Sequence, residues 1–185
     1  VVPPNYPRYL HFSKMLRQIY SDYTDTVEPF GLDECWLDVT GSGLLFGSPE
    51  KIAHDIRRRV RFELGITVSV GVSWNKIFAK LGSDYKKPNA VTVINKDNYK
   101  KIVYPLPVSD LLMIGPATTR KLKSHGIYTI GDLASAPPEM LAAFLGKMGY
   151  ILHAFANGRE SSPVTASGCA PIIKSVGNGI TAPRD

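Results

Sequence analysis

The sequence predicts an α+β protein, in which a layer of strands and helices is followed by a small all-helical module. Two observations carry this prediction. Over residues 1–104, apolar stripes at helical spacing alternate with short β-branched or aromatic runs. The composition then changes at Pro105-Leu106-Pro107, after which strand-like runs give way to short helical patterns separated by glycines.

The first elements of the mixed layer are a helix and a hairpin. Phe12, Leu16 and Ile19 recur at helical spacing and predict an amphipathic helix over residues 8–22. Two short apolar runs, residues 26–32 and 35–39, predict the strands of a hairpin with acidic residues at its turn.

The rest of the layer alternates helices and strands. An apolar stripe from Ile52 to Leu64 predicts a helix over residues 49–64, which Gly65 ends. Its arginines, residues 57–59 and 61, lie largely off this stripe and are interpreted as a solvated face. A strand over 67–72, a helix over 75–85 and a strand over 90–94 follow.

Composition narrows the class of protein. The 185 residues carry a net charge of +6 with a pI near 9.3, which favours an acidic partner such as nucleic acid. Two distant cysteines, Cys35 and Cys169, argue against a disulfide framework or a zinc site and favour a reducing compartment. No apolar run reaches the length of a membrane span. Because the chain opens on Val1 without Met, we interpret it as part of a longer protein.

The predicted hairpin turn, residues 31–38 with the sequence GLDECWLD, holds the adjacent carboxylates Asp33 and Glu34. Such neighbours repel each other unless a cation neutralises them. Carboxylate oxygens suit Mg²⁺ or Mn²⁺, and phosphoryl-transfer enzymes hold two Mg²⁺ in this way. The alternative is a polar β-turn whose acids face water.

Residues 69–89 form the second informative segment. Asn75 is a candidate cap for a helix whose N-terminus points toward a phosphate group. Lys76 and Lys80 share one face of this helix, and Lys87 follows it directly before a proline. The alternative is a capped surface helix with solvated lysines.

The C-terminal module has the form of a helix-hairpin-helix element. Gly115 would let its turn approach a DNA phosphate, and helix N-terminal amides would bind that anion without reading sequence. Thr118 and Lys121 follow on the same predicted helix, and Lys147 lies between two later glycines. The alternative is a packed helical subdomain without DNA contact.

These segments together resemble the Y-family (DinB/UmuC-type, ImpB/MucB/SamB) of translesion DNA polymerases. Residues 31–38 match the family pattern S-x-D-E-x-x-L-D, with Gly31 in place of Ser. Residues 69–89 match S-x-G-x-x-x-N-K-x-x-A-K-x-x-S-D-x-x-K-P-x, after which Ala90 replaces the usual Gly. In the helical module, Met113 stands where the family often has the first glycine of G-x-G.

The resemblance implies a domain organisation and a set of site residues. Residues 1–104 would be part of the palm, 105–165 the thumb, and 166–185 a linker toward a little-finger domain. Asp33 and Glu34 would be two of three metal-binding carboxylates that hold two Mg²⁺ in the intact polymerase. Lys87 would contact the nucleotide triphosphate. The DNA-binding residues would be Gly115, Thr118, Lys121 and Lys147.

The resemblance also implies partners and a cellular role. Primer-template DNA and deoxynucleoside triphosphates are the expected partners, with a sliding clamp as a further candidate contacted through regions outside this chain. A membrane is not expected, and the location is cytoplasmic, on the nucleoid when DNA is bound. The expected role is DNA repair by damage bypass within the SOS response. The first catalytic Asp and the fingers would precede Val1, so we expect the chain alone to be inactive.

Two rival functions are weighed against this one. The first is a non-catalytic DNA-binding or accessory protein that kept the helical module and lost the chemistry. The second is a metal-dependent nuclease, which the Lys87 segment disfavours because that segment has no evident use there.

Overall fold

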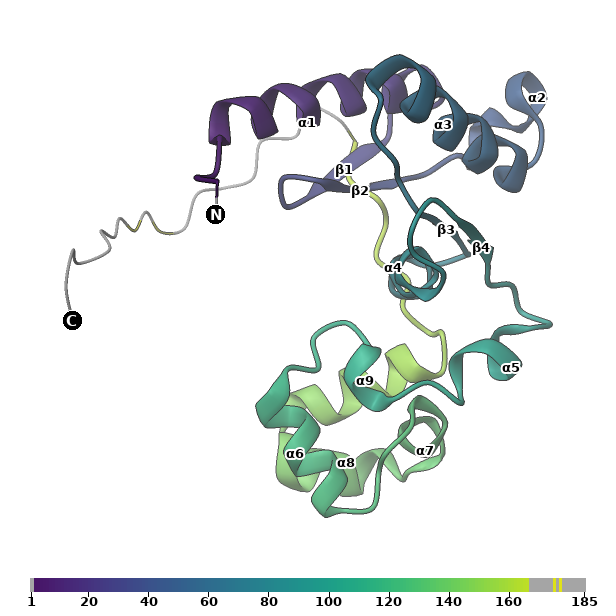
Figure 1. Cartoon of the computed structure of the whole chain (residues 1–185). Coiled ribbons are helices and arrows are strands. Elements are labelled where there is room, and N and C mark those ends of the chain that lie inside the picture. The colour runs from purple at the N-terminus through teal and green to yellow at the C-terminus, as the bar shows by residue number, and fades with distance from the viewer. Residues whose placement is uncertain (1, 167–174, 176, 178–185) are drawn as a thin grey trace.

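The structure, a computed structural model, describes residues 2–166 together with Ser175 and Gly177 (Figure 1). The helices and strands follow the order α1 (Tyr6–Ser21), β1 (Val27–Phe30), β2 (Glu34–Leu37), η1 (Thr40–Ser42), α2 (Gly43–Phe46), α3 (Pro49–Leu64), β3 (Val70–Val72), α4 (Lys76–Tyr85), β4 (Val91–Val93), α5 (Tyr99–Val103), η2 (Val108–Asp110), α6 (Pro116–Ser124), α7 (Ile130–Ser135), α8 (Pro138–Leu145) and α9 (Lys147–Ala156). The predicted mixture of helix and sheet is confirmed.

The strands form two separate pairs. β1 and β2 are an antiparallel hairpin in which Phe30 lies opposite Glu34 next to the turn. β3 and β4 are parallel, with Val70 opposite Val91, and α4 makes the crossover between them. A parallel pair requires such a crossover because the chain must return to the same end of the sheet. Among the described residues, no strand joins the two pairs into one sheet.

Helices α1 and α3 pack on each other and on the hairpin, and they form the first hydrophobic core. Leu16 and Ile19 of α1 contact Ile52, Ile56 and Val60 of α3 in this core. Each helix begins at a side-chain cap: Asn5 accepts from an amide of α1, and Ser48 accepts from one of α3. The left-handed Gly65, at φ 68°, ends α3 as its sequence predicts.

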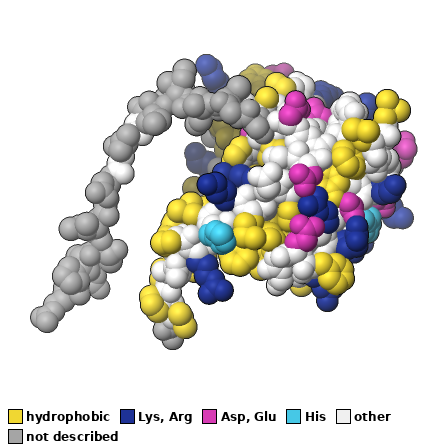
Figure 2. Space-filling view, turned by 90° about the horizontal axis from the view of Figure 1, so that it is seen from above, with side chains coloured by type: hydrophobic (Ala, Val, Ile, Leu, Met, Phe, Trp, Pro, Cys, Tyr) yellow, Lys and Arg dark blue, Asp and Glu magenta, His cyan; other side chains and the backbone are white. Residues whose placement is uncertain are grey.

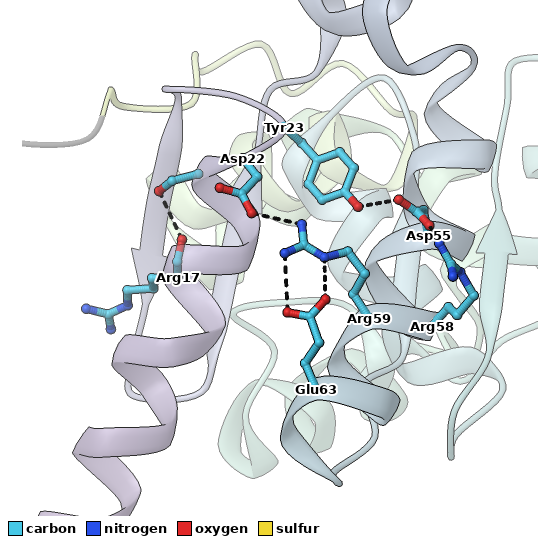
Figure 3. Close-up of polar contacts among 8 residues, drawn as sticks. Arg17, Asp22, Tyr23, Asp55, Arg58, Arg59 and Glu63 are labelled. Atoms are coloured by element: carbon cyan, nitrogen blue, oxygen red, sulfur yellow. Dashed lines mark hydrogen bonds and ion pairs between the residues drawn. The ribbon is translucent and has the colours of Figure 1, made fainter.

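A polar network ties the end of α1 to α3 (Figure 3). Arg59 pairs with Asp22 at 2.9 Å and with Glu63 at 2.6 Å, while the Tyr23 hydroxyl donates to Asp55. Two of the arginines interpreted as a solvated face therefore have fixed partners. Arg59 lies in this network, and Arg57 donates to the Asn89 carbonyl at 2.7 Å. That interpretation was wrong for these two, because their partners lie in distant segments of the chain.

Helix α4 lies directly against β3. A Cβ placed on Gly71 would stand 1.9 Å from the Ala79 carbonyl oxygen and 2.6 Å from the Ser83 nitrogen. A Cβ placed on Gly82 of α4 would in turn lie 3.1 Å from the Gly71 Cα. Glycines on both elements therefore permit the close contact between α4 and β3. The close packing fixes the position of every side chain that α4 carries.

The C-terminal helices form a second core, which also includes α4 and Ile94, the residue after β4. Phe78 of α4 and Ile94, both fully buried, join Leu122, Leu141 and Leu152 of the later helices. Outside this core, Trp74 stacks edge-on against Phe78 and donates to the Gly158 carbonyl at 3.2 Å. The helical module and the mixed layer are thus joined through α4 (Figure 1).

The predicted helices and strands were mostly found, with shorter strands than expected. The predicted strand over 67–72 is ordered as a strand only at 70–72, and that over 90–94 only at 91–93. Helices α2 and α5 were not predicted. Most of the predicted linker 166–185 lies outside the described residues, and so does Cys169.

Candidate functional site

The hairpin turn presents Asp33 to solvent and places Glu34 at the start of β2. Gly31 opens the turn with φ 78°, a conformation that disfavours residues with a side chain. The turn is held against α1, because the Ser13 hydroxyl donates to the Leu32 carbonyl and Arg17 donates to the Gly31 carbonyl at 3.4 Å. The two carboxylates therefore have a defined position.

A chain of ion pairs links the turn to α4 and the segment after it. Lys80 lies 3.0 Å from Glu34 and 2.5 Å from Asp84, and Lys87 lies 2.6 Å from Asp84. Partial burial works to lower the pKa of Lys80, but the pairs with Asp84 and Glu34 outweigh it and raise that pKa. Burial likewise works to raise the pKa of Asp84, and the two lysines hold it below its usual range.

The N-terminus of α4 is satisfied within the chain. Asn75 accepts from the Phe78 amide at 2.8 Å, so the predicted cap is confirmed. The Lys76 amide donates to Glu160 at 3.3 Å, and the Lys76 ammonium pairs with Glu28 at 2.6 Å. A carboxylate of the chain itself thus already lies at this helix terminus, where an anion is stabilised by the helix dipole.

One groove of about 1140 Å³ is lined by most of these groups, including Asp33, Glu34, Lys76, Lys80 and Lys87. Its lining includes Asp33 and Glu34 of the hairpin, strand β3, Lys80 of α4 and Lys87, which follows that helix. Residues 160–164 and apolar side chains of α1 and α3 also line it. The structure therefore brings the predicted carboxylates and the predicted triphosphate lysine to the same cavity.

The turn offers two hard carboxylates, and among the described residues no cluster of three or more His, Cys, Asp or Glu side chains could hold a metal ion. Oxygen ligands of this type fit Mg²⁺ or Mn²⁺, which retain several water ligands and are also coordinated by substrate phosphates. Asp38, which follows the strand, instead accepts from the Thr40 amide at 2.9 Å, and hydrogen bonds from the Thr40 side chain and amide hold the pKa of Asp38 below its usual range. Its role is local.

The candidate DNA-binding residues lie on two helices. Gly115 is the exposed N-cap residue of α6, Thr118 and Lys121 lie one turn apart on that helix, and Lys147 opens α9. A Cβ on Gly115 would meet nothing within 4 Å, so the fold itself does not require glycine there. Met113 is the residue with a left-handed backbone, at φ 72°, and its side chain is 60% exposed.

Sequence reasoning missed three acidic residues that contact the charged groups of this groove. Asp84 bridges Lys80 and Lys87, Glu28 pairs with Lys76, and Glu160 accepts from the α4 terminus. The i,i+4 spacing of Lys80 and Asp84 was a usable signal. Glu28 and Glu160 gave none, because their partners are distant in sequence.

The sequence of the chain is similar to those of known DNA polymerases. Residues 1–84 match the sequence model of the impB/mucB/samB family. The chain is 57% identical over 185 residues to DNA polymerase IV of Acetivibrio thermocellus, a match that covers 100% of the chain and 46% of that protein. It is 38% identical over 188 residues to DNA polymerase IV 2 of Bacillus subtilis strain 168, covering 100% of the chain and 45% of that protein.

Solved structures give the same result. An insertion ternary complex of Dbh DNA polymerase superposes with a TM-score of 0.80 at 31% identity, over 88% of this chain and 48% of that one. DinB from Sulfolobus solfataricus superposes with a TM-score of 0.77 at 30% identity, over the same shares. The chain belongs to the Y-family of translesion DNA polymerases. It spans about half the length of the curated relatives it matches.

No helix within the described residues combines the length and apolar character needed to cross a membrane.

Proposed function

We propose that this chain is part of an error-prone, template-directed DNA polymerase that copies past DNA damage by nucleotidyl transfer. The observation that carries the proposal is the groove in which Asp33 and Glu34 face Lys80 and Lys87. Carboxylates for metal ions beside cations for a triphosphate are what this reaction needs. The parent protein would act on the nucleoid.

Within this proposal, Asp33 and Glu34 would hold Mg²⁺, which when bound stabilises the charge that develops on the attacking and leaving oxygens. Lys87, whose side chain is 56% exposed, would bind the triphosphate of the incoming deoxynucleotide. Lys80 is more enclosed and lies between Glu34 and Asp84, so it would hold these carboxylates in position. Asp33 is exposed at the hairpin turn and would be open to a metal ion.

The two carboxylates require a third from outside the described residues. β2 and β3 each have an edge without a strand partner among the described strands, and both edges border the groove. An additional strand laid along these edges would satisfy their backbone groups. We propose that such a strand carries the third metal-binding carboxylate, in keeping with the expectation for the first palm strand.

For the domains, we assign residues 1–104 to the palm and 105–165 to the thumb. The thumb would grip duplex DNA through the amides at the start of α6 and through Thr118, Lys121 and Lys147. Contacts of this kind reach only phosphates, so binding would be independent of sequence. Primer-template DNA and deoxynucleoside triphosphates would be the substrates.

A primer-extension assay tests the proposal. The 185-residue chain alone should not extend a primer with Mg²⁺ or Mn²⁺, because misplaced metals and a missing carboxylate cost several powers of ten in rate, roughly the scale of positioning effects. A chimera should extend it, if the remaining regions of the Acetivibrio polymerase are fused to this chain. Asp33→Ala should abolish extension by the chimera, while the control Asp25→Ala, in an exposed turn, should not.

Three outcomes would contradict the proposal. Extension by the chain alone, lost in Asp33→Ala, would mean that the catalytic set was misplaced. Extension by a chimera that survives Asp33→Ala would remove that residue from the site. A folded chimera that binds duplex DNA without extending it would favour the non-catalytic DNA-binding alternative.

A further inference from the structure

A second groove lies on the outer face of α3, away from the candidate active site. It has a volume of about 570 Å³ and is lined by residues of α2, α3 and the turn at Asn89. Helix α3 lies between the two grooves: Ala53 and Ile56 line the first and Arg58 and Phe62 the second, while Ile52 and Asn89 border both. A ligand bound here would leave the Asp33 groove open.

The rim of this outer groove is unusually apolar for a surface. Leu45 and Phe62, both in its lining, are 83% and 79% exposed, and the neighbouring Leu44 is fully exposed. The three side chains come from two elements, α2 and α3. Figure 2 shows hydrophobic side chains among charged ones on the part of the surface that carries these helices. Exposed apolar side chains gathered beside a groove mark a contact site rather than ordinary surface.

The charge of the outer groove is positive. Its lining holds four basic side chains and one acidic side chain, which leaves a formal excess of three positive charges. The basic residues are Lys51, Arg57, Arg58 and Arg61, and the acid is Asp55. Asp55 is already paired with Arg58 and accepts from Tyr23 (Figure 3). The uncompensated charge therefore lies on Lys51, Arg57 and Arg61. Arg57 donates to a neutral carbonyl, that of Asn89, and Arg61 directly precedes the exposed Phe62 on α3.

We propose that the outer groove docks a short acidic segment of another protein, which inserts one or two large apolar side chains beside Leu45 and Phe62. Charge complementarity selects the acidic partner, and the apolar rim selects a protein over a nucleic acid. Phosphate contacts gain nothing from exposed leucines, whereas a few apolar anchors carry most of the energy of a protein contact. A groove of this size accepts a few side chains, which fits a weak regulatory contact.

Selection from displayed random peptides of about 12 residues, with the 185-residue chain as bait, tests the docking site. The enriched peptides should carry Asp or Glu around Leu, Phe or Trp. A labelled enriched peptide should bind in fluorescence anisotropy with a Kd on the order of 10–100 μM. Arg61→Glu and Phe62→Ser should each weaken this binding about tenfold. Both residues are exposed, and circular dichroism would verify the fold of each variant.

Matched controls fix the location. Lys123→Glu and Tyr150→Ser change an exposed cation and an exposed aromatic residue on α6 and α9, and should leave peptide binding unchanged. The proposal is overturned if no peptide is enriched, if the enriched peptides lack acidic residues, or if Arg61→Glu binds them as tightly as the unchanged chain. It is also overturned if Arg61→Glu and Phe62→Ser weaken binding of an oligodeoxythymidylate about tenfold, since the surface would then bind nucleic acid. The readout is peptide binding, so failure here leaves the proposed polymerase function untouched.

Discussion

Replacing Lys80 by Met should strengthen Mn²⁺ binding at the Asp33–Glu34 turn. The Lys80 ammonium lies 3.0 Å from a Glu34 carboxylate oxygen. A metal ion bound to that carboxylate at about 2.1–2.3 Å would lie within roughly 5 Å of the ammonium. Met keeps most of the apolar stem of Lys80 in its place, so the change removes the charge with little loss of packing.

The size of the effect follows from that distance. A divalent ion and an ammonium about 5 Å apart repel by about 1.7 kcal/mol in water, and physiological salt screens roughly half of this. Removing the ammonium should therefore strengthen Mn²⁺ binding by about 1 kcal/mol, or about fivefold in Kd. The Lys80 side chain is only 18% exposed, so a lower local dielectric would enlarge this value.

Calorimetric titration with Mn²⁺ measures the change. The unchanged chain should bind with a Kd between roughly high micromolar and millimolar, because two carboxylates without a nucleotide make a weak site. Lys87→Met is the matched control. The Lys87 side chain is 56% exposed, and its ammonium pairs with Asp84 rather than Glu34, so its effect should be smaller. Affinity that is unchanged or lower in Lys80→Met would refute the placement of the metal on Glu34, and tight binding that survives Asp33→Ala would put the metal elsewhere.

Three further predictions concern DNA binding and the fold. A plot of the logarithm of duplex affinity against the logarithm of salt concentration should have a slope of about −2 to −4, and Lys121→Ala should make it shallower by about 1. A steeper slope, or a preference for one DNA sequence, would contradict binding through phosphate contacts alone. Gly71→Ala should lower the free energy of unfolding, measured in urea, by about 3 kcal/mol, because its Cβ would stand 1.9 Å from the Ala79 carbonyl oxygen. Gly41→Ala, whose Cβ would have nothing within 4 Å, should lower it far less. Equal effects of the two changes would contradict the close packing. Met113→Gly should raise the melting temperature of the chain. Glycine relieves about 1–2 kcal/mol of left-handed backbone strain, which outweighs the roughly 0.5–1 kcal/mol that its backbone entropy costs. A lower melting temperature would contradict this reasoning.

Local patterns in the sequence predicted the elements and the turn well. The cap at Asn75, the stop at Gly65 and the acidic hairpin turn each depend on residues within a few positions of one another, and the structure confirms all three. The resemblance of whole segments added the family, which the comparisons confirm. The roles of Asp33 and Lys87 in catalysis stay predictions.

Contacts between segments that are distant along the chain could not be predicted from the sequence. Glu160 reaches the α4 terminus across 84 positions, and Glu28 reaches Lys76 across 48. Neither spacing leaves a periodic signal that a single sequence could reveal. The same holds for Arg59, whose pairing with Asp22 required the α1–α3 contact to be known. Helix α2 escaped prediction because its four residues are too few to show a helical period.

The ion pairs of the groove bear directly on how it would receive a nucleotide. Three of the four lysines in its lining already have a carboxylate partner: Lys76 has Glu28, Lys80 has Glu34 and Asp84, and Lys87 has Asp84. A triphosphate that approaches Lys87 must therefore compete with Asp84, and it brings its own negative charge near Asp33 and Glu34. Divalent cations entering with it would offset that repulsion. We accordingly expect the groove to bind nucleotide and metal together, each weakly without the other, so that Lys87 alone does not define the nucleotide site.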